Sequence, residues 1–157
     1  MSDRPIDRGQ QWLKQLLTLA ACPTEVHAEE KPDCYWLTID HTNLTPEQID
    51  ILIGAKGSVL DSIQYLANTI LNLGQTPDQQ AAYTIELNNY RSHRQAELEA
   101  IALNAVAHVR ETGEEFEIKS LSSAERRQLH NLLKEYDDLE TYSRGQEPDR
   151  RLVVYRR

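Results

Sequence analysis

Long hydrophobic runs are absent from the sequence. The longest apolar stretch, residues 16–22, is interrupted by Thr18 and is far shorter than the roughly 20 residues that cross a membrane. Residues 1–9 are polar, and no apolar segment of the signal-peptide type follows them. These features predict a cytoplasmic protein without membrane insertion.

Cysteine is almost as scarce, with Cys22 and Cys34 as the two thiols in 157 residues. Neither has neighbours at the spacing of metal ligands, and a disulfide is not expected in a reducing compartment. Four histidines also have no partner at ligand spacing: His27, His41, His93 and His108. We therefore expect no metal and no other cofactor.

Signatures of catalysis are missing as well. The sequence has no P-loop, no nucleophile beside a base in a motif, and no paired carboxylates at a glycine-rich cleft. We expect no catalytic residues, and a nuclease is the least supported alternative.

Positive charge is in deficit, because 17 Lys and Arg stand against 25 Asp and Glu, for a net charge of −8. This sign is unfavourable for a protein that binds phosphates. The deficit lies in residues 1–115, with 8 basic and 17 acidic side chains, whereas residues 116–157 have 9 and 8. The acidic part permits an alternative function, a protein-protein adaptor that uses this fold as a docking surface.

The pattern of apolar residues predicts an α+β protein with two small sheets. Capping boxes at Thr45 and Ser122, each with Gln or Glu three residues later, mark two helix starts. Helical spacing predicts helices over residues 6–20, 45–53, 60–71, 90–112 and 122–136, and alternation predicts strands over 25–30, 35–40, 83–87, 116–118, 139–143 and 151–155. We expect a first domain at 1–89, a long connecting helix at 90–115 and a second domain at 116–157.

A glycine loop, Gly54-Ala55-Lys56-Gly57, separates two of the predicted helices. Glycines lack the Cβ atoms that would keep a sugar-phosphate backbone at a distance, and the next helix starts with free N–H groups. Lys56 adds a positive charge. The loop predicts a clamp for about four nucleotides of single strand, with Ile53, Leu60 and Ile63 around an apolar groove. A plain turn between two helices is the alternative.

Arg126 and His130 lie four residues apart and therefore share one face of a predicted helix. Arginine offers a planar set of donors to phosphate, and the histidine ring can stack or form hydrogen bonds. A solvated helix face, or a buried structural role for His130, would produce the same spacing.

The surroundings of both motifs resemble the bacterial Jag family, also called KhpB. The resemblance runs in order over roughly residues 6–157 and is carried by residues 52–57, 60–68, 122–130, 139–143, 145, 147–148 and 150–154. It implies a type II KH domain, with the order α-β-β-α-α-β, followed by a small α/β R-3-H domain. The family commonly has a basic residue at the position of Ala55, so this loop has one positive charge fewer than the family pattern implies. Many members also carry an N-terminal Jag domain, which is not found in this sequence.

The resemblance implies a single-stranded RNA-binding protein that acts as an RNA chaperone or post-transcriptional regulator, with single-stranded DNA as a second ligand. It also implies roles in cell shape and a small KH-domain protein as partner. The RNA contacts that we expect are Gly54, Ala55, Lys56 and Gly57 in the loop, Arg126 and His130 in the helix, and Arg127, Arg144, Arg150 and Arg151 as electrostatic support.

Overall fold

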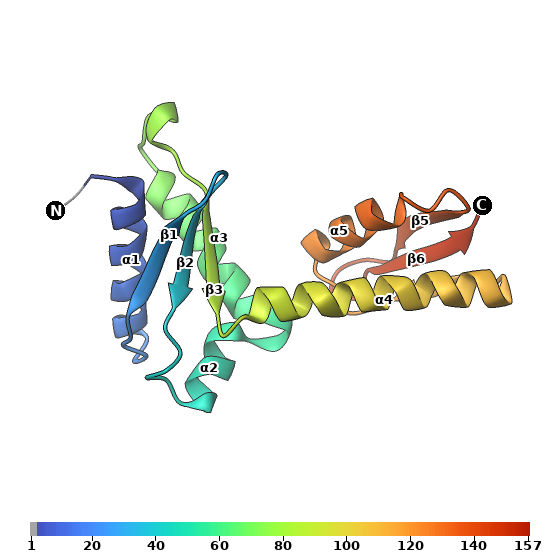
Figure 1. Ribbon diagram of the computed structural model, residues 1–157, viewed down its shortest axis with the longest axis horizontal. Helices are drawn as coiled ribbons and strands as arrows, with labels where there is room; N and C mark the ends of the chain where they lie inside the picture. Colours follow the sequence, from blue (N-terminus) through green and yellow to red (C-terminus); the bar gives the residue numbers. More distant parts are fainter. Residues whose placement is uncertain (1–2) are drawn as a thin grey trace. The chain divides into compact units, whose positions relative to one another are not determined.

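The computed structural model describes residues 3–157, which form two compact units that divide between Arg91 and Ser92 (Figure 1). Each unit combines helices with a three-stranded sheet, so the α+β class is confirmed. Among the described residues, no helix is both long and apolar enough to cross a bilayer.

The first unit has its elements in the predicted order α-β-β-α-α-β, which is compatible with a type II KH domain. These elements are α1 (Pro5–Leu19), β1 (Val26–Glu30), β2 (Tyr35–Ile39), α2 (Pro46–Ile53), α3 (Ser58–Asn72) and β3 (Tyr83–Leu87). In the sheet, β2 lies between β1 and β3, antiparallel to β1 and parallel to β3. Short 3₁₀ turns, η1 (Ala55–Gly57) and η2 (Pro77–Gln79), complete the unit.

The core of this unit lies between the sheet and the helices α1 and α3, which pack against β1 and β3 (Figure 1). Leu60 and Ile63 of α3 are only 0% and 6% exposed. The prediction that they line a binding groove is therefore wrong. Helical spacing placed them on one face of α3, and that face is turned to the sheet.

The outer edge of β3 is closed by amide side chains of α3. Asn68 accepts from the backbone N–H of Tyr83 at 2.9 Å and donates to its carbonyl oxygen at 2.9 Å. Asn72 makes the same pair of bonds with Ala81, and Gln64 accepts from the N–H of Ile85. Because an open strand edge can pair with other chains, this row of amides both fixes α3 and protects the sheet.

Replacing Asn68 with Leu should lower the free energy of unfolding by about 2 kcal/mol, because two backbone groups of Tyr83 lose their partners. Chemical denaturation followed by circular dichroism measures the change. Thr69→Ala, at the exposed neighbour, is the control and should stay within about 0.5 kcal/mol of the parent. Equal stability of the two variants would show that the amide bonds do not hold the edge.

The second unit contains most of α4 (Tyr90–Thr112), followed by β4 (Phe116–Ile118), α5 (Ser123–Leu133), β5 (Leu139–Arg144) and β6 (Arg151–Arg156). Its antiparallel sheet has the order β4-β6-β5. The helix expected as a connector contributes five buried side chains to this core: Leu98, Ala102, Ala105, Val106 and Val109. The predicted domain limits at 1–89, 90–115 and 116–157 stay predictions.

Candidate nucleic-acid interface

The glycine loop of the first unit requires both of its glycines. Gly54 and Gly57 have φ of 74° and 76°, a region that side chains disfavour. A Cβ on Gly57 would lie 2.5 Å from Cε1 of Tyr90, and one on Gly54 would lie 2.5 Å from Cγ2 of Val59. The two glycines of the motif are thus required by the backbone conformation of the loop, because another residue at either position would force its neighbours to move.

The surface of this loop suits an anion. Ala55 and Lys56 are exposed, and Lys56 makes no ion pair with any described residue. No side chain caps the start of α3 at Gly57. The N–H of Ser58 donates to the carbonyl oxygen of Ala55, and the N–H groups that follow it in the first turn have no side-chain partner among the described residues. Val59 and Ile51, which are 38% and 67% exposed, supply apolar surface near the loop.

Two residues after β3 contact the same region, and the sequence reasoning did not assign them. The Tyr90 ring packs over Gly57, and Arg91 donates from Nη1 to Asp61 in the first turn of α3 at 2.9 Å. Arg91 also donates from Nε to the carbonyl oxygen of Ile85 at 2.8 Å. The guanidinium offsets a carboxylate that would otherwise oppose a phosphate at the loop. The basic-aromatic run of residues 90–94 was the available signal.

In the second unit, Arg126 is buried, with 6% of its surface exposed. Nη1 donates to the carbonyl oxygen of Leu121 at 2.8 Å and to that of Arg150 at 3.4 Å, and Nη2 pairs with Glu147. The guanidinium therefore ties the start of α5 to the turn between β5 and β6.

Arg127 and His130 lie at a cavity of about 360 Å³ between α5 and β5, lined by Ser123, Arg126, Arg127, His130, Tyr142, Ser143 and Arg150. The side chain of Arg127 is exposed and forms no hydrogen bond or ion pair within residues 3–157. His130 is half-buried and its Nδ1 bonds the Thr141 hydroxyl. Tyr142, 40% exposed, is an aromatic member of the wall that the sequence reasoning did not single out.

The remaining predicted arginines differ in their surroundings. Arg150 donates to the carbonyl oxygen of Gly145 at 2.6 Å and reaches the cavity, whereas Arg144 and Arg151 are both paired with Glu117 at 2.8 Å. The bonds from Arg151 and Arg144 hold the pKa of Glu117 below its usual value, and the bond from Arg151 has the larger effect. The structure thus brings Arg126, Arg127, His130 and Arg150 together and places Arg144 and Arg151 in an ion-pair cluster.

Across the hairpin of β5 and β6, Glu140 accepts from Nε of Arg157 at 2.8 Å and from the Tyr155 hydroxyl at 2.7 Å, and it pairs with neither Arg150 nor Arg151. Within residues 3–157, no group of three His, Cys, Asp or Glu side chains is arranged to hold a metal ion.

Comparison with known proteins agrees with the fold of the second unit. Residues 96–156, which include α5 and its cavity, match the R-3-H domain family, so this chain is an R-3-H-domain protein. It is 31% identical over 114 residues to the RNA-binding protein KhpB of Clostridium symbiosum, covering 73% of this chain and 50% of that protein. It is 27% identical over 152 residues to KhpB of Bacillus subtilis, a match that covers 96% of this chain and 70% of that protein. It is 32% identical over 103 residues to KhpB of Streptococcus pneumoniae, a match that covers 66% of this chain and 31% of that protein.

The chain belongs to the Jag/KhpB family. It spans about half the length of the Clostridium symbiosum relative.

Proposed function

We propose that this protein binds single-stranded RNA, without catalysis, through the glycine loop of the first unit and the α5–β5 cavity of the second. The observation that carries the proposal is the loop itself, where two glycines at positive φ, an exposed Lys56 and an uncapped helix start offer a site for phosphate. The three relatives carry the name of an RNA-binding protein rather than that of an enzyme.

In the second unit, Arg127 and Arg150 are the side chains suited to bind phosphate at the cavity, with the Ser123 hydroxyl as a further donor. Arg126 acts mainly by holding the backbone of Arg150 in place. Arg144 and Arg151 add to the electrostatic attraction of RNA phosphates, although Glu115 and Glu117 offset their charge. Tyr142 offers an exposed ring against which a base can stack.

We propose that the protein acts in the cytoplasm as an RNA chaperone or post-transcriptional regulator, with a small KH-domain protein as partner. The support is the combination of the two surfaces proposed above with family membership. Cell-shape roles, which the family resemblance implies, belong to the same proposal. Single-stranded DNA is the second ligand to test beside RNA.

Replacing Arg127 and Arg150 together with Ala should weaken RNA binding and flatten its salt dependence. Each phosphate contact to a single strand contributes about 0.7 to the log–log slope, so the slope should fall by about 1.4. Fluorescence anisotropy titrations of a labelled oligonucleotide at several salt concentrations measure it.

The matched control is Arg144→Ala with Arg151→Ala, which also removes two arginines but takes them from ion pairs with Glu115 and Glu117. This control should change the slope by less than half as much. If both double variants melt like the parent and flatten the slope equally, the cavity is not the phosphate site.

A further inference from the structure

A second cavity lies on the other side of His130, in the same space between α5 and β5. Its volume is about 240 Å³, below the range of pockets for drug-sized ligands and therefore suited to a smaller group. His130 lines both this cavity and the cationic one described above. A single strand of RNA bound at Arg127 and Arg150 would thus reach this second cavity by passing His130.

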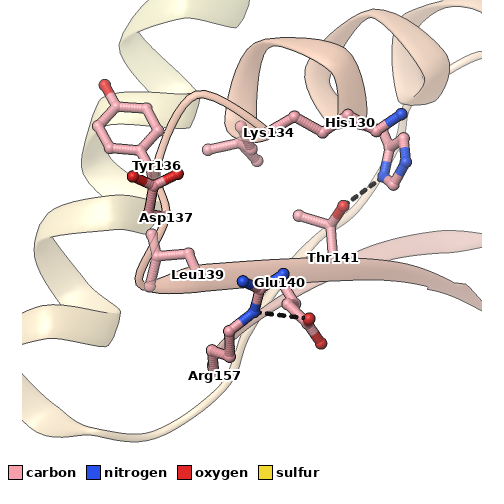
Figure 2. Close-up of a pocket in the computed structure, with 9 residues that line it drawn as sticks. His130, Lys134, Tyr136, Asp137, Leu139, Glu140, Thr141 and Arg157 are labelled. Carbon is pink, nitrogen blue, oxygen red and sulfur yellow. Dashed lines mark hydrogen bonds and ion pairs between the residues drawn. The ribbon is translucent and has the colours of Figure 1, made fainter.

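The walls of the second cavity combine an apolar floor with polar ends. Leu133 and Leu139 are 1% and 4% exposed and form part of the lining. In Figure 2, His130 and Thr141 stand at one end of the opening and Tyr136 and Asp137 at the other. A flat heterocycle with polar edges fits this arrangement, because its faces need apolar contact and its edges need hydrogen-bond partners.

The two carboxylates of this cavity differ in availability. Glu140 accepts hydrogen bonds from the Tyr155 hydroxyl at 2.7 Å and from Nε of Arg157 at 2.8 Å. Both bonds lower the pKa of Glu140, and the bond from Tyr155 has the larger effect. Asp137 is exposed and has no hydrogen-bond or ion-pair partner among the described residues. Lys134 and Arg157 also line the cavity and balance the two negative charges, so the site does not repel RNA as a whole.

We propose that this cavity holds one base of the bound RNA and that Asp137 selects bases with an exocyclic amino group. An ionised carboxylate only accepts hydrogen bonds, so it can bind the N4 amino group of cytosine but is repelled by the O4 carbonyl of uracil. The proposal rests on the proposed RNA-binding function and adds a preference to it.

The test compares octamers of cytidine and of uridine by fluorescence anisotropy, with the whole protein and with Asp137→Asn. An amide both donates and accepts, so this variant should lower the ratio of the two affinities by about fivefold, the lower end for one base contact. The matched control is Glu135→Gln, which removes the same charge two residues away, on the exposed part of the chain outside this cavity. The control should keep the parent's ratio, and melting curves confirm that each variant is folded.

An unchanged ratio in folded Asp137→Asn would overturn this inference and leave the proposed function intact. An equal loss of preference in Glu135→Gln would also overturn it, because the effect would then come from charge alone. If the folded parent bound neither octamer nor a mixed-sequence RNA, the proposed function would fail, and this inference with it.

Discussion

Replacing Ala55 and Lys56 together with Asp should weaken RNA binding by about a hundredfold and leave the melting temperature unchanged. The change removes one positive charge and adds two negative charges beside the phosphates, and each is worth about 1 kcal/mol at contact distance in water. The fold should tolerate it, because both side chains are exposed and Lys56 has φ of 54°, a conformation that Asp accepts more readily than most residues.

Filter binding and circular dichroism decide this prediction. The control is Ala55→Asn with Lys56→Asn, which has the same shape without the negative charges and should lose binding to a smaller extent. Unchanged affinity of a folded Asp variant would show that the loop does not contact RNA. Conversely, Ala55→Lys should strengthen binding, because it adds the positive charge that this loop lacks.

Arg126→Ala should destabilise the second unit by about 3 kcal/mol and reduce RNA binding more than His130→Ala does at neutral pH. Arg126 is 6% exposed, and its guanidinium bonds three groups on two segments. Hydrogen bonds to a charged group contribute about 1.5–3 kcal/mol each before the structure relaxes. Without the guanidinium, the turn that carries Arg150 loses its tie to α5.

The matched control is the neighbouring Arg127→Ala, which removes an exposed arginine without structural partners among the described residues. It should weaken binding while its free energy of unfolding stays within about 0.5 kcal/mol of the parent. Chemical denaturation separates the two effects. If Arg126→Ala unfolds at the parent's denaturant concentration, Arg126 has no structural role.

The features that the sequence predicted well are those decided by neighbouring residues. Thr45 and Ser122 each accept from a backbone N–H three residues later, and both capping boxes are present in the structure. The glycine loop is equally local, since positive φ at Gly54 and Gly57 follows from the residue type and from the two helices beside it. Alternation and helical spacing sufficed for the order of elements for the same reason.

The features that the sequence did not predict depend on contacts between distant segments. Helical spacing shows that Leu60 and Ile63 share a face with other apolar residues, but the position of the sheet decides that this face is buried. The motif predicts an exposed Arg126, but its side chain donates to the carbonyl oxygen of Arg150, which is 24 residues away in the sequence. The second cavity near Asp137 depends on the turn after α5 folding back beside β5, which no local pattern reports.

The most direct test of the account is a titration of labelled single-stranded RNA with the intact protein and with a variant altered at both proposed surfaces. The variant combines Ala55→Asp and Lys56→Asp with Arg127→Ala and Arg150→Ala. We expect the parent to bind RNA more tightly as salt is lowered, and the folded variant to lose measurable binding at the same concentrations. Binding by the folded variant at the parent's affinity, or no binding by the folded parent, would contradict the account.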